Sequence, residues 1–132
     1  MKLLTLAAGV LVGAVYTTGS FACNSWDFGS SLTMRQANGA AVALNGIRQK
    51  QRNAEQEFVA QASYSQGKGQ AKGSLDREGR LVFDVFWDNG SVGRYTAHVN
   101  QRGAVLDGRT FDQVHPESWS IWTMNRRIDC RD

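Results

Sequence analysis

The chain has 132 residues, including 15 Lys or Arg and 12 Asp or Glu, which gives a formal net charge of +3. The basic residues are spread along the chain, and this argues against a nucleic-acid-binding protein, in which Lys and Arg gather on one stripe. One proline and 14 glycines are present, and the glycines recur at turn positions. This punctuation favours short strands over helices.

The first residues have the layout of a secretory signal peptide. Lys2 supplies a positive start, Leu3 to Val15 is apolar, and Ser20-Phe21-Ala22 places small residues just before Cys23. Cleavage is expected after Ala22. The apolar run is too short to span a bilayer comfortably, and no other stretch could do so. We therefore expect a secreted or periplasmic protein with no stable membrane insertion after cleavage.

Residues 23–132 are then expected to form a single domain after the signal peptide at 1–22. The two cysteines, Cys23 and Cys130, lie at its two extremes, and in an exported protein such a pair is expected to form a disulfide. A lipid anchor on Cys23 is the alternative, although Ser20 stands where a lipoprotein signal carries a branched aliphatic residue. The disulfide requires the first and last strands to meet.

The first half of the domain reads as four strands with alternating apolar and polar residues. A polar segment, Arg48 to Gln56, separates the second strand from the third, and it is expected to be a helical turn or a loop. The four strands cover Ser31 to Gln36, Ala41 to Ile47, Glu57 to Tyr64, and Lys68 to Leu75.

The strongest local signal is a hairpin between Arg80 and Val99. Asp88-Asn89-Gly90 joins two alternating runs, and such a turn requires residues that tolerate positive φ. The inward face is expected to carry Leu81, Phe83, Val85 and Trp87, then Gly93, Tyr95, Ala97 and Val99. A strand at Ala104 to Thr110, a loop at Phe111 to Glu117 and a final strand at Ser118 to Met124 follow.

Eight sequential antiparallel strands form either a sandwich or a closed up-and-down barrel. Small residues are expected on the inward face of two strands, where they suit tight coiling. The end-to-end disulfide also suits closure, which removes both exposed edges. The sequence therefore favours an all-β, eight-stranded antiparallel up-and-down barrel over a β-sandwich. The small residues are Gly69, Ala71, Gly73, Ala104 and Gly108.

Several segments are similar to the avidin and streptavidin group of calycin-like barrels. Trp26 followed by Gly29-Ser30 resembles the opening of that group, Val85 to Asn89 resembles its mid-barrel strand, and Trp122 resembles the Trp that caps the biotin site. The resemblance implies the barrel architecture. The Asn between the opening Trp and Ser, and the late Asp, which complete biotin recognition, have no counterparts, so biotin binding is not expected.

Two further segments, Asn89 to Tyr95 and Gly103 to Asp112, resemble repeats in small uncharacterised secreted bacterial proteins. That resemblance implies no activity.

Catalytic and metal-binding residues are not evident. His98 is expected on the polar side of its strand and His115 in a loop, and two histidines without a third ligand make a weak zinc site. Asp84 and Asp107 are expected to meet Lys or Arg on neighbouring strands, and Asp88 belongs to its turn. We therefore expect no enzyme, no metal and no cofactor. Asp84, Asp88, Asp107 and Asp112 are the carboxylates considered for glycoside hydrolysis, a reaction that needs two carboxyl groups close together.

The aromatic residues are the main functional candidates. Aromatic walls with a few polar tips are how barrels hold flat or sugar-like ligands. The alternative is that Trp87 and Trp122 fill the interior, because an eight-stranded barrel is just wide enough for its own side chains. The candidate ligand-binding residues are Trp87, Tyr95, Trp122, Trp26 and Tyr64, with the first three at the mouth.

Two functions from different classes follow. The first is a non-enzymatic barrel that binds a small molecule or glycan. The second is a protein-binding module, such as a hydrolase inhibitor, that uses the segments Arg48 to Gln56 and Phe111 to Glu117, with Trp119 and His115 as surface contacts. A structural component of the cell envelope would need neither a cavity nor an exposed aromatic patch.

Overall fold

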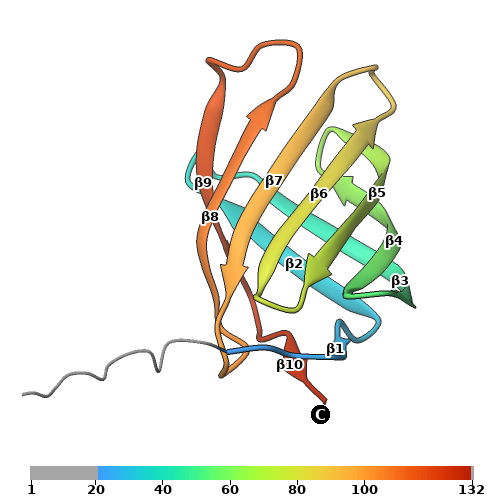
Figure 1. Cartoon of the computed structure of the whole chain (residues 1–132). Coiled ribbons are helices and arrows are strands. Elements are labelled where there is room, and N and C mark those ends of the chain that lie inside the picture. The colour runs from blue at the N-terminus through green and yellow to red at the C-terminus, as the bar shows by residue number, and fades with distance from the viewer. Residues whose placement is uncertain (1–20, 132) are drawn as a thin grey trace, which may run out of the picture.

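The computed structural model describes residues 21–131, in which the regular elements are all β-strands (Figure 1). The expected signal peptide therefore falls almost entirely outside the described residues. The strands are β1 (Trp26–Asp27), β2 (Ser31–Gln36), β3 (Ala41–Arg52), β4 (Glu55–Tyr64), β5 (Gly67–Asp76), β6 (Arg80–Trp87), β7 (Val92–Val99), β8 (Val105–Asp112), β9 (Trp119–Met124) and β10 (Asp129–Cys130). Within residues 21–131 there is no helix long and apolar enough to span a membrane.

Strands β2 to β9 form a closed barrel in which each strand pairs with its neighbour in sequence. All of these pairings are antiparallel, and the barrel closes where β9 meets β2, with Met34 opposite Met124 and Gln36 opposite Trp122. The up-and-down barrel predicted from sequence is confirmed, and the sandwich is excluded.

The alternation of apolar and polar residues along β6 and β7 defines the inward face of these strands, as expected. Leu81, Phe83 and Val85 are buried, as are Tyr95 and Val99 on the next strand. Because successive strand side chains point to opposite sides, these residues converge on the barrel axis. The interior is filled by an aromatic column in which neighbouring ring centroids lie 4.5 to 6.2 Å apart, formed by Phe28, Phe58, Phe83, Tyr95 and Trp122.

Two inward glycines allow the large rings to lie against the strands. A Cβ on Gly73 would stand 2.2 Å from the Phe83 Cβ, and one on Gly108 would stand 2.2 Å from the Trp122 carbonyl oxygen. No side chain fits at such distances. Gly73 and Gly108, two of the small residues read from the sequence, therefore mark points of close packing, whereas Ala104, also expected on the inward face, precedes β8.

The interpretation of Arg48 to Gln56 as a loop or helical turn was wrong. β3 continues to Arg52 and β4 begins at Glu55, so the connection is a tight turn with Asn53 at φ 52°. A bulge beside Gly46 shifts the register, after which the inward position is Gln49. The apolar alternation disappears here because glutamines hold the inward positions.

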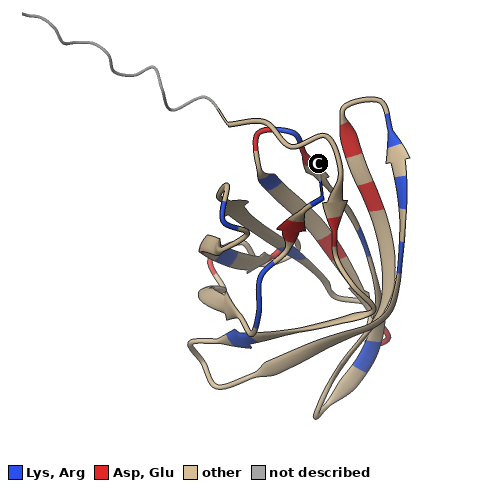
Figure 2. Ribbon diagram, turned by 90° about the horizontal axis from the view of Figure 1, so that it is seen from below, with Lys and Arg blue, Asp and Glu red and all other residues tan. Residues whose placement is uncertain are grey.

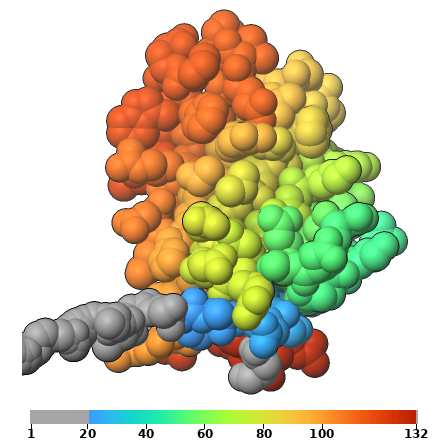
Figure 3. Space-filling model, viewed as in Figure 1, coloured from blue at the N-terminus to red at the C-terminus, as the bar shows by residue number. Residues whose placement is uncertain are grey.

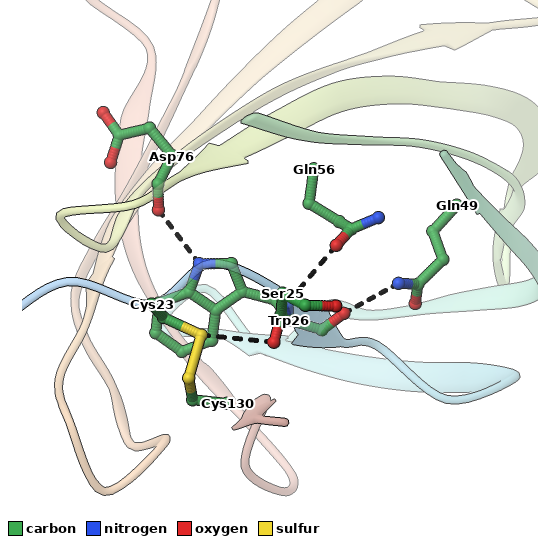
Figure 4. The surroundings of a disulfide bond; sticks show 7 residues. All are labelled: Cys23, Ser25, Trp26, Gln49, Gln56, Asp76 and Cys130. Atoms are coloured by element: carbon green, nitrogen blue, oxygen red, sulfur yellow. Dashed lines mark hydrogen bonds between the residues drawn. A yellow bond between two sulfur atoms is a disulfide. The ribbon is translucent and has the colours of Figure 1, made fainter. Parts of the chain in front are cut away.

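Those glutamines bind the backbone of β1, as Figure 4 shows. The Trp26 amide donates to Gln56 Oε1 at 3.2 Å, and Gln49 Nε2 donates to the Trp26 carbonyl at 2.7 Å. The buried Trp26 indole donates from Nε1 to the Asp76 carbonyl at 2.9 Å. Trp26 therefore closes the end of the barrel at which β5 finishes and β4 starts.

The expected disulfide is present at this same end (Figure 4). Cys23 and Cys130 are 5.8 Å apart at Cα, and β1 pairs with β10 so that Trp26 lies opposite Cys130. The two ends of the domain do meet, as the sequence required. They do so in a short two-stranded sheet outside the barrel, which was not predicted from the sequence.

Charged residues are scattered over several strands and turns (Figure 2). Asp84 and Arg94 form a cross-strand pair, with Arg94 Nε and Nη2 donating to the carboxylate at 2.8 and 3.0 Å. The hydrogen bonds from Arg94 hold the pKa of Asp84 below its usual value. Asp107, expected to pair in the same way, lies at a bulge with φ 57° and forms no ion pair within the described part of the chain.

Candidate ligand site at the barrel mouth

The end of the barrel opposite Trp26 is open and holds a cavity of about 230 Å³. Four connections surround it, namely those between β2 and β3, β4 and β5, β6 and β7, and β8 and β9. In Figures 1 and 3 the β8–β9 hairpin forms the top of the molecule, while β1 and β10 lie at the bottom. The cavity is therefore a cup at the top of the barrel, above the aromatic column.

Five aromatic residues line the cup, and three of them, Tyr64, Trp87 and Tyr95, belong to β4, β6 and β7, while Phe111 and Trp119 belong to β8 and β9. Tyr64 ends β4 and Trp87 ends β6, and their rings meet nearly at right angles, at 72° with centroids 4.7 Å apart. Tyr95 comes from the inward face of β7. Gly93, two residues before it, leaves space: a Cβ there would lie 3.3 Å from the Tyr95 ring and 3.6 Å from Trp87 Nε1.

Tyr95 forms the floor. Its ring stacks on Phe83 with centroids 5.0 Å apart, and its hydroxyl donates to Gln36 Oε1 at 2.9 Å. Burial raises the pKa of Tyr95 to about 12, although a hydrogen bond with Thr110 acts in the opposite direction. The floor is therefore a neutral phenol at physiological pH.

Most polar side chains of the cup form hydrogen bonds within the protein. Gln36 Nε2 donates to Asn38 Oδ1 at 3.4 Å, and that oxygen also accepts from the Ala40 amide. The hydroxyl of Ser91 donates to Asn89, and that of Ser120 donates to a backbone carbonyl. The neutral polar groups thus serve mainly to hold the rim together.

Asp112 is the single charged side chain among the described residues that line the cup. It ends β8 directly opposite Gly93, on the same inward face as Gly108 and Thr110. Its Oδ1 accepts from the amides of Val114 at 2.8 Å and His115 at 3.3 Å. No Lys, Arg or His within residues 21–131 forms an ion pair with it.

The structure separates the five aromatic residues selected from the sequence. Tyr64, Trp87 and Tyr95 come together in the cup, whereas Trp26 is buried at the opposite end. Trp122, expected at the mouth, is 3% exposed and lies beneath it, with Nε1 donating to the Arg109 carbonyl at 2.9 Å. The lower barrel is therefore filled, as the alternative predicted, and its upper end is hollow.

Gln36 and Thr110 were not predicted from the sequence as residues of the site, and Asp112 was considered only as a catalytic carboxylate. Each is a polar residue at an inward position near the mouth end of its strand. The sequence signal for these site residues was a polar residue at the end of a strand, in a position where the alternation predicts an apolar one. Using this signal requires knowing which strand ends lie together at the open end of the barrel.

The predicted surface contacts are exposed. Trp119 is 62% exposed, and the Arg109 guanidinium lies 5.8 Å from the centroid of its ring. His115 and His98 are also exposed. Within the described part of the chain, no cluster of three or more His, Cys, Asp or Glu residues could hold a metal ion.

A second depression, of about 520 Å³, lies over β3 to β6. Side chains of both charges surround it, and two of its three carboxylates already form ion pairs, Glu57 with Arg52 and Asp84 with Arg94. Aromatic rings do not converge there as they do at the mouth.

No known protein family matches this chain, and neither a curated protein nor a solved structure matches it. The resemblance to avidin-like proteins thus reduces to the shared architecture of an eight-stranded closed barrel.

Proposed function

We propose that this protein is a non-enzymatic binding barrel that takes a small molecule, or one small unit of a glycan, into the cup at its mouth. The observation that carries the proposal is the convergence of Tyr64, Trp87 and Tyr95 around a cavity of about 230 Å³. Ligand sites in proteins are typically concave and aromatic, with a few polar groups. Sites for drug-sized ligands measure about 300–1,000 Å³, so this cup suits a smaller molecule.

The proposal includes export to a secreted or periplasmic location. The signal-like first 22 residues and the Cys23–Cys130 disulfide support it, because disulfides persist in oxidising compartments. A sulfur atom in a disulfide cannot also carry a thioether-linked lipid. The disulfide therefore favours simple cleavage after Ala22 over a lipid anchor on Cys23.

The experiment is a titration of the domain 23–132 with a panel of metabolites and saccharides, in which binding is detected by tryptophan fluorescence. Trp87 lies in the cup, so a ligand there should shift or quench its emission. Gly93→Val should abolish the response while the fold is retained, because its side chain would fill the space beside Trp87 and Tyr95. Thr96→Val, on the outer face of the same strand, is the matched control.

A response that survives Gly93→Val would place the ligand outside the cup. The absence of any response across the panel would contradict the proposal.

The second candidate, a protein-binding module, is favoured by a different observation. Val114, Trp119 and Ile121 are 64%, 62% and 53% exposed along the β8–β9 hairpin. The other segment expected to serve this function, Arg48 to Gln56, is paired strand rather than loop. Retention of a partner by the intact domain, lost in Trp119→Ser but kept in Gly93→Val, would support this function.

A further inference from the structure

We propose that the ligand of the cup is a small organic cation whose ammonium group sits among Tyr64, Trp87 and Tyr95 and faces Asp112. This inference rests on the proposed function and names the chemical class of its ligand.

The aromatic rings of the cup are arranged in a way that suits a cation. Tyr64 and Trp87 meet edge to face at 72°, and the largely buried Tyr95 closes the cup from below. A cation near the face of an aromatic ring is attracted by the negative charge density of that face, most strongly for Trp. Several such faces around one space are the arrangement that holds alkylated ammonium groups.

The charge of the cup also suits a cation. Although the whole chain has a formal net charge of +3, the described residues lining the cup include no Lys, Arg or His. Asp112 contributes a carboxylate at the inward end of β8, and no cation within residues 21–131 neutralises it. One oxygen accepts from two loop amides, and the charge itself is left for a ligand.

The neutral polar groups provide another argument. A sugar is recognised through many directed hydrogen bonds, which need free planar side chains. Here Gln36 bonds to Tyr95 and Asn38, and Asn38 also accepts from Ala40. Most of the recognition elements left open are ring faces, a carboxylate and the Trp87 Nε1–H, which suit an organic cation with one oxygen atom better than a saccharide.

The Trp87 Nε1–H adds a further feature of the ligand. It lies beside the space left by Gly93 and has no hydrogen-bond acceptor within residues 21–131. A hydroxyl or ether oxygen on the ligand would accept from it. The chemistry of the cup thus matches an amino alcohol or its N-alkylated form.

The experiment compares choline with its uncharged isostere 3,3-dimethyl-1-butanol, in which carbon replaces nitrogen. Binding to the full domain is measured by tryptophan fluorescence and by calorimetry. We expect choline to bind at least about tenfold more tightly than the isostere, because only the charged form gains the cation–π and carboxylate attractions.

Two variants test the residues. Trp87→Leu should weaken choline binding about tenfold. Asp112→Asn keeps an oxygen to accept from the loop amides but removes the charge, and it should weaken choline binding about fivefold without changing the affinity for the isostere. Asp107→Asn is the matched control, because Asp107 is an exposed residue of the same strand outside the cup.

The outcomes separate this inference from the proposed function. Equal binding of choline and its isostere, or binding of a saccharide but not of choline, would overturn the cation and leave the small-molecule site standing. A panel in which neither cations nor neutral compounds bind would overturn both. Choline binding unaffected by Asp112→Asn and Trp87→Leu would place the cation elsewhere.

Discussion

Tyr95 is the residue at which the packed interior meets the cup, and the burial of its phenol predicts a loss of stability at alkaline pH. Burial raises its pKa to about 12 in the folded state, against a usual value of 10.0. The folded state therefore holds this proton more tightly than the unfolded state. The stabilisation is fully present below pH 10 and should be lost as the pH rises toward 12, by on the order of 2–3 kcal/mol.

Denaturant unfolding at pH 8 and pH 11.5 measures this loss. Tyr95→Phe is the control, since it has no proton to lose. At pH 8 it should cost about 1 kcal/mol through loss of the hydrogen bond to Gln36. An equal alkaline loss in both proteins would mean that another group is responsible.

The pairing of β8 with β9 depends on a residue without a side chain. Gly108 lies opposite Trp122, and a Cβ there would stand 2.2 Å from the Trp122 carbonyl and 2.8 Å from its ring. Gly108→Ala should therefore lower the free energy of unfolding by about 1–3 kcal/mol, because strand or ring must move. Equilibrium denaturation measures the change.

The same substitution on the neighbouring strand is the matched control. At Gly93 the nearest atom to a Cβ is 3.3 Å away, so Gly93→Ala requires little movement. It also reduces the freedom of the unfolded chain, which stabilises by up to about 1 kcal/mol. Similar destabilisation by both variants would show that the cost at Gly108 is not steric.

Among the elements, those with strict apolar alternation were predictable, and those with polar inward residues were not. β6 and β7 carry large apolar residues at every second position, so their sequence alone defines the inward face. The β3–β4 turn could not be predicted from the sequence, because Gln49 and Gln56 occupy inward positions and bind β1. Without β1 in place, nothing in that segment distinguishes a strand from a polar loop.

The site was predictable in its aromatic residues but not in its location. Trp87 and Tyr95 lie on a strand pair whose faces the sequence defines, so their inward direction followed. Trp26 was grouped with them, yet it lies at the other end, because its position depends on the pairing of β1 with β10. That contact joins residues about 100 positions apart and leaves no local periodic signal.

At the scale of the whole molecule, the two ends of the barrel have different tasks. One end is closed by Trp26, its glutamine contacts and the disulfide, while the other holds the cup. The aromatic column separates them. Stability and binding are therefore expected to respond to different substitutions, since the aromatic column lies between the two groups of residues.

Removal of the disulfide tests whether stability and ligand binding depend on different ends of the barrel. The bond joins residues 107 positions apart, and closing so long a loop contributes up to about 4–5 kcal/mol in the chain-entropy model. Each kcal/mol shifts the melting temperature by about 4–8 °C in a small domain. If half of that free energy is realised, the double variant Cys23→Ser, Cys130→Ser should melt at least about 8 °C lower than the oxidised protein.

Well below its lower transition, the reduced form should bind the ligand of the cup with unchanged affinity, because the barrel strands around the mouth close without the disulfide. Calorimetry on both redox forms measures the transition, and fluorescence titration measures the affinity. An unchanged melting temperature would mean that the sulfurs do not constrain the chain. Loss of binding in a folded, reduced protein would mean that the closed end and the cup are coupled through the aromatic column.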